Sequence, residues 1–381
     1  MMKQLGCLLI VGVFLAASGQ TLGSAEQSGT QTKSFPATRG GSLEVVIDGG
    51  EIVLVPWEKN EVFVRAEVDP ADVRFLKMTQ NANTVRVQFR ADGSDGDVRF
   101  EINLPSQFNT DLRTGGGNIE FRGALNGNLK ATTGGGNVTL ADIGGRIDVT
   151  TGGGNVEAGK IQGQAMLQTG GGNISVRSAG GDVEISTGGG NIEVGDIGKT
   201  LRVSTGGGNV ALGDVGGTAT VSTGGGNIGV GKVSGSAVLT TAGGNVDLRG
   251  ASGTVKATTA GGDLTLRGIS GSIEGTTAGG NIHAELIASG KGPSNLETAG
   301  GGIKLFLPEN AKVTIQALIE VRGRRNERKQ YEIRSDFAHD SYDNDTAGRG
   351  EIRATYKLNG GGETILLESV NGNIEIRKAG R

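Results

Sequence analysis

Hydrophobic and polar residues alternate in short runs through the middle of this chain, and glycine pairs or triplets end each run. In residues 137–154, Val138 and Leu140 alternate with polar residues in one run, and Ile147 and Val149 do so in the next. Alternation of period two puts such side chains on one face of a strand, and runs bounded by glycines are typical of strands joined by turns. This unit therefore predicts two short strands and two turns, which together form one circuit of a flattened coil.

The unit recurs about every 18 residues, with a Thr-Gly-Gly-Gly-Asn tract or a close variant at the same place in each copy. A fixed repeat of this length predicts stacked units, because one unit is too small to bury its own apolar face. We expect strands of successive coils to pair in parallel at about 4.8 Å, which makes the chain an all-β, parallel β-helix with β-rich caps. The tracts begin at Thr114, Thr133, Thr151, Thr169, Thr187, Thr205, Thr223, Thr241, Thr259 and Thr277.

The composition divides the chain beyond its first residues into three regions. Residues 34–113 have longer predicted strands and form an N-terminal β cap that runs continuously into the first coil, whereas residues 114–302 hold the glycine-rich repeats. Residues 303–381 lose the period and predict a C-terminal β cap with a charged insertion at 320–350. Large side chains gather in the N-terminal cap, where they predict a conventional core. They are Trp57, Phe63, Phe75, Phe89 and Phe100.

Residues 1–25 have the pattern of a secretory signal peptide. Lys3 is followed by an apolar stretch from Leu5 to Ala17, which is too short to span a bilayer, and then by small residues. Cleavage after Ala17 removes Cys7, so we expect no disulfide and no cysteine chemistry in the mature chain. No second apolar span follows, so the sequence predicts an exported protein, periplasmic, extracellular or at the cell surface, without an integral membrane span.

The residue after each glycine run predicts a column of side chains down one corner of the coil. Stacked carboxamides can accept from and donate to neighbouring coils and so satisfy turn backbone groups. The alternative is that the column is a ligand-binding face, but the structural role is the commoner use of turn asparagines. The column is Asn118, Asn137, Asn155, Asn173, Asn191, Asn209, Asn227, Asn245, Asp263 and Asn281.

The charged insertion interrupts an otherwise regular scaffold and is therefore the predicted place of a specific partner contact. Its basic residues precede a set of aspartates, and the net charge of the whole chain is only -3. A balance so close to neutral does not indicate nucleic acid or a membrane surface as the partner. The predicted contact residues are Arg322, Arg324, Arg325, Arg328 and Lys329.

Several tracts resemble the bacterial "putative adhesin" families, also called toast-rack or head-GIN domains. They include Gly40–Val45, Glu51–Trp57, the repeated Gly-Gly-Asn-Ile/Val tracts and Glu368–Ile376. The resemblance covers roughly residues 34–378. It implies a right-handed single-stranded β-helix outside the cytoplasm, attached in some members to envelope-stress membrane components. The family defines no catalytic residues, so none is carried over.

Enzymatic and metal-binding sites need residue patterns that the repeats lack. A polysaccharide-degrading β-helix needs paired carboxylates on one outward face, but the outward row that includes Lys130, Asp148, Glu184 and Arg202 never places acids on successive coils. Calcium-binding repeats need aspartates in every turn, where this chain has asparagine. His283 and the other histidine, His339, have no partner at metal-ligand spacing. We therefore expect neither catalysis nor a cofactor.

A second outward row carries mostly hydroxyl groups at coil spacing, which suits contact with a glycan or with ice. Its alternative role is a hydroxyl ladder with high strand propensity. The sequence thus predicts a non-enzymatic, adhesin-like or envelope interaction scaffold whose partner is an envelope protein or a surface glycan. The alternative function is a carbohydrate-binding or polysaccharide-degrading β-helix. The hydroxyl row is Thr132, Thr150, Gln168, Ser186, Ser204, Ser222, Thr240, Thr258 and Thr276.

Overall fold

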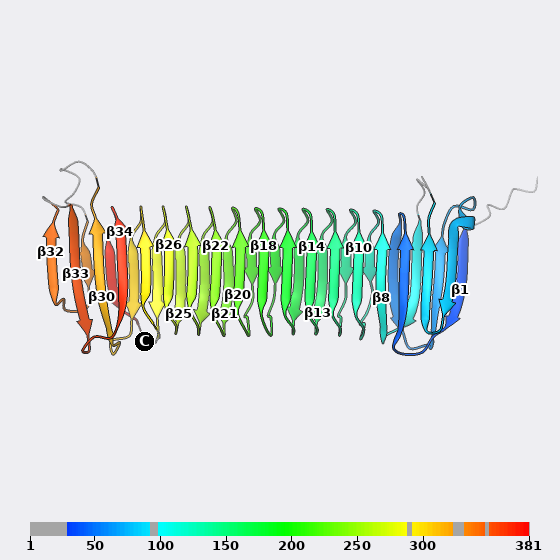
Figure 1. The fold of residues 1–381 in the computed structure, drawn as a ribbon, viewed down its shortest axis with the longest axis horizontal. Coiled ribbons are helices and arrows are strands. Elements are labelled where there is room, and N and C mark those ends of the chain that lie inside the picture. Colours follow the sequence, from blue (N-terminus) through cyan, green and yellow to red (C-terminus); the bar gives the residue numbers. More distant parts are fainter. Residues whose placement is uncertain (1–28, 92–97, 288–291, 323–330, 347–349, 381) are drawn as a thin grey trace, which may run out of the picture.

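The protein is an elongated rod made of two long β-sheets that face each other, with turns along both edges (Figure 1). In the described ranges the only helical element is a single 3-10 turn, η1 (Val73–Phe75), and no helix there is long and apolar enough to cross a membrane. The predicted all-β solenoid is confirmed. The computed structural model describes residues 29–91, 98–287, 292–322, 331–346 and 350–380.

Each repeat contributes one strand to each sheet, and successive repeats stack in parallel. In one repeat, β11 (Val138–Leu140) lies in the first sheet and β12 (Ile147–Thr151) lies in the second. Val138 pairs with Val156 in the next coil, and Ile147 pairs with Ala165. The other first-sheet repeat strands are β9 (Ile119–Phe121), β13 (Val156–Ile161), β15 (Ile174–Ala179), β17 (Ile192–Val194), β19 (Val210–Leu212), β21 (Ile228–Val233), β23 (Val246–Ala251), β25 (Leu264–Ile269), β27 (Ile282–Leu286) and β29 (Ile303–Leu307). The other second-sheet repeat strands are β8 (Phe108–Thr114), β10 (Leu129–Thr133), β14 (Ala165–Thr169), β16 (Val183–Thr187), β18 (Leu201–Thr205), β20 (Ala219–Thr223), β22 (Ala237–Thr241), β24 (Val255–Thr259), β26 (Ile273–Thr277) and β28 (Ser294–Thr298).

The core is a narrow file of small branched side chains between the sheets. Val138, Leu140, Ile147 and Val149 are all at most 3% exposed, as their alternation predicts, and Ile143 at the turn between the two strands is fully buried as well. Equivalent positions in neighbouring coils are opposite one another, so each side chain packs against its counterparts above and below. The apolar face of one coil is thus covered by its neighbours, which is why the fold needs the stack.

The N-terminal region does not feed into the repeats in sequence order. The coil of β2 (Gly41–Ile47) and β3 (Glu51–Trp57) lies between the coil of β6 and β7 and the coil of β8 and β9. The chain therefore passes outward from its first coil, builds the end of the rod and then returns to start the array. Both sheets of the predicted cap continue into the first coil, but the coils of the cap are not stacked in sequence order. The other elements are β1 (Thr30–Pro36), β4 (Glu61–Glu67), β5 (Leu76–Asn81), β6 (Thr84–Phe89) and β7 (Arg99–Pro105).

Only part of the predicted aromatic core of this end is buried. Phe89 and Phe100 lie in the interior with their ring centroids 5.9 Å apart. Trp57 and Phe63 instead stack on the outside at 6.4 Å, and Phe75 is 36% exposed. The alternation of β4 turns Val62 and Val64 inward, which leaves Phe63 on the outer face. Phe35, Phe108 and Phe121 are buried at this end as well.

The C-terminal end also contains a coil that is stacked out of sequence order. The coil of β34 (Glu363–Val370) and β35 (Ile374–Lys378) is inserted between the coil of β28 and β29 and the coil of β30 (Val313–Glu320) and β31 (Ile333–Ser335). A hairpin of β32 (Ser341–Asp345) and β33 (Glu351–Leu358) then extends the second sheet at the tip (Figure 1). The inserted strands, β2 and β3 at one end and β34 and β35 at the other, are therefore held on both edges by parallel neighbours.

Candidate functional site

The threonine that starts each glycine tract faces inward and joins successive coils. Thr151 is 2% exposed, and its Oγ1 donates to the carbonyl oxygen of Gly136 at 2.7 Å. Thr151 Oγ1 also accepts a hydrogen bond from the backbone N–H of Gly154 at 3.2 Å. This pair of bonds recurs in every coil from Thr114 to Thr298, and Ser369 donates in the same way in the inserted coil. The threonines reveal the 18-residue period in the sequence, but their hydroxyl groups were not predicted to form a buried ladder.

The predicted corner column is present as one continuous file. The Oδ1 atom of Asn155 accepts the backbone N–H of Asn173 at 2.8 Å, and the same contact repeats from coil to coil. Asp263 replaces asparagine in one coil, and its carboxylate accepts a hydrogen bond from the backbone N–H of Asn281. The contact begins at Asn118 and ends where Asn281 accepts from Gly302. Each side chain thus places its oxygen on the next coil, while the residue itself remains exposed.

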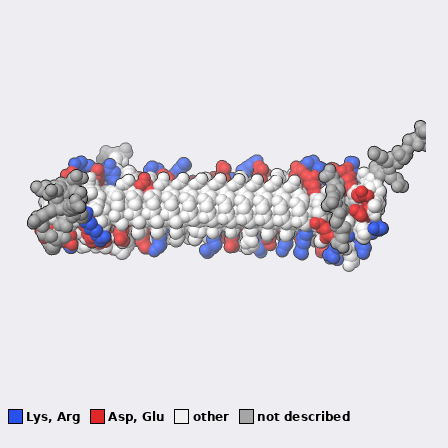
Figure 2. Space-filling model, turned by 90° about the horizontal axis from the view of Figure 1, so that it is seen from above, with Lys and Arg blue, Asp and Glu red and all other residues white. Residues whose placement is uncertain are grey.

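The edge that carries these turns has a long uncharged face, which we call the neutral band. It consists of three files between Thr132 and Asn245, namely the outward hydroxyl row, the middle glycines of the turns and the exposed asparagines. Figure 2 looks onto this edge and shows the uncharged band along the rod, with Lys, Arg, Asp and Glu along both margins. The middle glycines Gly135 and Gly153 have open space where a Cβ would stand, so the band is flat for lack of side chains.

At the opposite edge, aspartates hold the coils together as the asparagines do. Asp142 Oδ1 accepts the backbone N–H of Lys160 at 2.8 Å, and Asp214 Oδ1 accepts that of Lys232 at 2.7 Å. Asp196 accepts from Asp214 at 3.0 Å. These carboxylates are therefore committed to backbone donors. Within the described ranges, no three His, Cys, Asp or Glu residues group closely enough to hold a metal ion.

The structure describes only one of the five predicted basic contact residues. Arg322 forms an ion pair with Glu320 at 2.7 Å, and its backbone N–H donates to Asn371 Oδ1 at 2.8 Å. Arg322 thus lies beside the inserted C-terminal coil, and its side chain is 73% exposed. The remaining four, Arg324, Arg325, Arg328 and Lys329, lie outside the described residues.

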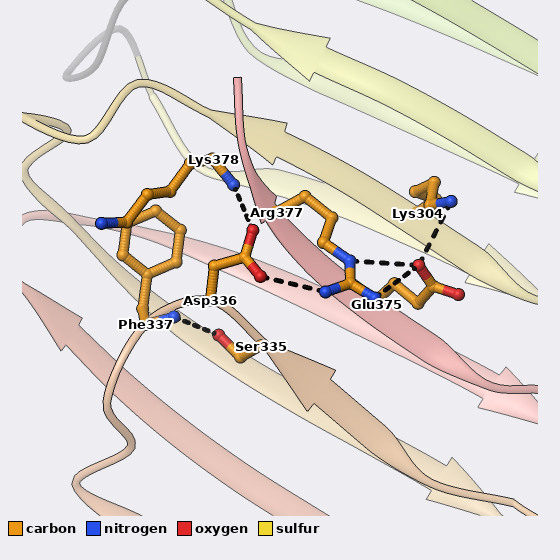
Figure 3. A network of polar contacts seen from close by, with 7 residues as sticks. All are labelled: Lys304, Ser335, Asp336, Phe337, Glu375, Arg377 and Lys378. Carbon is orange, nitrogen blue, oxygen red and sulfur yellow. Dashed lines mark hydrogen bonds and ion pairs between the residues drawn. The ribbon is translucent and has the colours of Figure 1, made fainter. Parts of the chain in front are cut away.

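A network of charged groups fastens the inserted strand β35 to its two neighbours (Figure 3). Glu375 lies 3.2 Å from Lys304 Nζ on β29 and 3.1 Å from Arg377. Asp336, which follows β31, accepts from Arg377 at 2.9 Å and from the backbone N–H of Lys378 at 3.0 Å. These two donors lower the pKa of Asp336. Burial raises the pKa of Glu375, but the hydrogen bonds from Lys304 and Arg377 outweigh it and lower the pKa.

The two histidines occupy unrelated surroundings. His283 stands on β27, half-buried, with its ring 4.8 Å from that of Phe306. Burial, together with the positive charges of Arg267 and Lys304, lowers the pKa of His283. His339 lies near Tyr342 and Tyr356 at the tip of the rod. The two rings therefore do not share a site.

A long groove that was not predicted lies on the outer side of the first sheet. This groove, of about 830 Å³, runs along β11, β13, β15, β17 and β19. Its charged side chains are Asp142, Glu157, Arg177 and Glu193. Glu157 pairs in register with Ser175, and Ser175 pairs with Glu193, so the two glutamates share one outward row. The signal in the sequence is the 18-residue spacing of Glu157, Ser175 and Glu193.

The model of the Toastrack DUF4097 family matches residues 173–377, which is more than half of the 381 residues. A comparison with curated proteins found no match.

Solved structures similar to this chain include three bacterial proteins of low sequence identity. The first is a "putative cell adhesion protein" from Clostridium sporogenes, 10% identical, covering 93% of this chain and 100% of its own, with a TM-score of 0.19. The second is a "putative adhesin" from Bacteroides fragilis, 14% identical, covering 92% and 97%, with a TM-score of 0.19. The third is a "putative lipid binding protein" from Parabacteroides distasonis, 10% identical, covering 93% and 98%, with a TM-score of 0.21.

Proposed function

Because the chain belongs to the Toastrack DUF4097 family, which its glycine and asparagine tracts predicted, we propose that it is an exported, adhesin-like scaffold of the bacterial cell envelope. It acts without catalysis and binds an envelope protein or a surface glycan through repeated weak contacts. The observation that carries the proposal is the neutral band, in which the same uncharged polar groups recur on successive coils.

Repetition at a fixed spacing suits a surface that offers many equivalent contacts. Each coil adds one outward hydroxyl or amide, such as Ser204, Ser222 or Thr240, and one exposed asparagine to the band. Contacts that are individually weak add up when they are rigidly linked, because later contacts form at a high effective concentration. A rigid rod therefore gains avidity along its length without needing a deep pocket.

The use of the repeated polar groups supports a scaffold without catalysis. Buried threonine hydroxyls such as Thr151, and the Oδ1 atoms of Asn155 and Asp142, are committed to hydrogen bonds between coils. A catalytic acid or base must instead be within reach of a substrate proton. These regular groups serve the stack, and the groups left facing outward in the band are uncharged.

The proposal is tested by placing charges on the band and on a neighbouring row of the same strands. The variant Ser222→Lys/Thr240→Lys introduces two lysines into the band on β20 and β22. The matched control, Thr220→Lys/Val238→Lys, introduces two lysines on the same strands and the same outer face, two residues earlier. We expect the band variant to lose binding to isolated bacterial envelopes in a co-sedimentation assay, with the control retaining it. Equal binding by both proteins would contradict the proposal.

A further inference from the structure

We propose that the groove along β11 to β19 binds a linear, uncharged polysaccharide that lies parallel to the axis of the rod. The groove lies toward the opposite end of the first-sheet strands from the asparagine file, with Asn155 before β13 and the groove residues Ala158 and Gly159 within it. The proposal therefore goes beyond the adhesin-like scaffold and does not depend on the neutral band.

Small residues line the groove where β11, β17 and β19 end and where β13 loses its alternation. In β13, Ala158 and Gly159 are buried in succession, which breaks the alternation and turns the strand. The equivalent glycines have no room for a side chain, since a Cβ at Gly195 would stand 2.0 Å from the carbonyl oxygen of Arg177. A Cβ at Gly159 would stand 2.4 Å from Asp142 Oδ1. The floor is therefore backbone, and a ligand can approach it closely.

Three charged side chains in the groove have unused hydrogen-bonding capacity. Among the described residues, Glu157, Arg177 and Glu193 take part in no ion pair and no side-chain hydrogen bond, and all three are exposed. Some outward charges elsewhere are paired across coils, for example Lys130 with Asp148 at 3.8 Å and Lys256 with Glu274. Carboxylates that accept from hydroxyls and a guanidinium that donates to oxygens are the groups that fix a sugar by charge-assisted hydrogen bonds.

The arrangement of these groups favours a polymer that runs along the rod. Glu157 and Glu193 occupy one row with Ser175 between them, so they are two coils apart, or roughly 10 Å at the spacing of paired strands. Beyond Glu193 the row continues with Ala211 and then Gly229, which leave the path open. An extended β-1,4-linked glycan turns over at each unit, so every second sugar presents the same edge. Alternate sugars could then meet Glu157 and Glu193, with Arg177 between them.

The charge of the groove decides between classes of polysaccharide. Three carboxylates, Asp142, Glu157 and Glu193, face one guanidinium, so the groove is negative. Like charges repel, and uronate or sulfated chains are therefore disfavoured. An uncharged chain meets no such repulsion and supplies hydroxyl donors for the carboxylates. This selects neutral over acidic glycans.

The test measures binding of labelled hexasaccharides to the whole chain by fluorescence polarisation. Cellohexaose, laminarihexaose and mannohexaose are the neutral probes, and hexagalacturonate is the acidic probe. We expect at least one neutral probe to bind with a Kd of about 1 mM or tighter, and hexagalacturonate to bind at least about tenfold more weakly. Failure of all three neutral probes to bind, or equal binding of the acidic one, would overturn the proposal.

Variants then locate the binding site. Glu157→Ala/Glu193→Ala should weaken the neutral probe at least about tenfold, as should Ser175→Trp, which fills the groove between them. The matched control is Glu184→Ala, which removes an exposed carboxylate from β16 on the second sheet. Thermal unfolding checks that the variants remain folded, and exposed truncations should leave it unchanged. The proposal fails if binding is unaffected in the folded groove variants.

The band variant Ser222→Lys/Thr240→Lys should retain hexasaccharide binding, so the two proposals can fail separately.

Discussion

The hydroxyl of Thr151 donates a hydrogen bond of 2.7 Å to the carbonyl oxygen of Gly136, one coil earlier in the stack. Both residues are buried, and the threonine also accepts from Gly154 at 3.2 Å. One side chain therefore satisfies two backbone groups in a turn that is covered by its neighbours. This relationship, repeated along the rod, holds the glycine turns in line.

Replacing Thr151 by valine should destabilise the protein by about 1–3 kcal/mol, because a buried carbonyl and a buried N–H lose their partner while the shape is kept. Urea unfolding measures the change. Thr150→Val removes an exposed hydroxyl from the same strand and serves as the control, with an expected change within about 0.5 kcal/mol. Equal effects of the two substitutions would argue against a structural role of the inward hydroxyl.

Neighbouring glycines of one turn should respond to alanine in opposite directions. A Cβ at Gly154 would stand 2.0 Å from the carbonyl oxygen of Gly136, whereas a Cβ at Gly153 would meet nothing within 4 Å. Gly154→Ala should therefore cost at least about 1–3 kcal/mol through overpacking. Gly153→Ala should be neutral or stabilising by up to about 1 kcal/mol, since it restricts the unfolded chain. The urea midpoints of the two variants measure this difference, and Gly154→Ala should have the lower midpoint. A strong loss of stability in Gly153→Ala would contradict the prediction.

One buried hydroxyl lacks a partner, and its removal should stabilise the protein. Thr110 Oγ1 makes no hydrogen bond although the residue is only 4% exposed, and its neighbours in register are Leu43 and Leu129. Thr110→Val keeps the shape and removes the desolvated hydroxyl, so we expect a gain of about 1 kcal/mol. Thermal or urea unfolding measures it beside Thr151→Val. A loss of stability in Thr110→Val would show that this hydroxyl has a favourable contact.

Acid should weaken the network around β35. The pKa of Asp336 is lowered in the folded protein by the Lys378 N–H and the Arg377 side chain, so its stabilising contribution is present above the ordinary pKa of 3.8 and is lost as the pH falls through the folded value. Asp336→Asn should lower the melting temperature at pH 7, and its difference from the unsubstituted protein should shrink below about pH 4. Glu184→Gln, on the other sheet, is the control. A difference that grows in acid would contradict this assignment.

The repeats were predictable because period-two alternation and an 18-residue period, visible as Thr133 and Thr151, determine both strand direction and stacking. The column from Asn118 to Asn281 could also be placed, since the residue after a glycine turn must recur at the same corner. The ends were not predictable in the same way. Strands β34 and β35 could pair in parallel with the edges of several similar coils. Nothing in the local pattern of Glu363–Lys378 specifies that they insert between two earlier coils.

The candidate sites were predicted less completely than the fold. The outward row of Asp148 and Glu184 on the second sheet predicts no paired acids, whereas Glu157 and Glu193 lie on the outward row of the other sheet. The groove itself depends on a bend at Ala158 and Gly159, where two residues in succession face inward. A break in alternation of a single residue is a weak signal in sequence, although it changes the shape of the surface.

The central claim is that one coil is the unit of the fold and that its neighbours complete it. Deleting residues 191–208 removes one whole repeat and joins Gly190 to Asn209, whose backbone N–H would then meet the Oδ1 atom of Asn173. Deleting residues 191–199 removes half a repeat and brings a second-sheet strand where a first-sheet strand belongs. We predict that the whole-repeat deletion folds with a melting temperature close to that of the full chain and a rod shorter by about 4.8 Å, measured by small-angle scattering. The half-repeat deletion should lose cooperative unfolding. Tolerance of the half-repeat deletion together with collapse of the whole-repeat deletion would contradict the account.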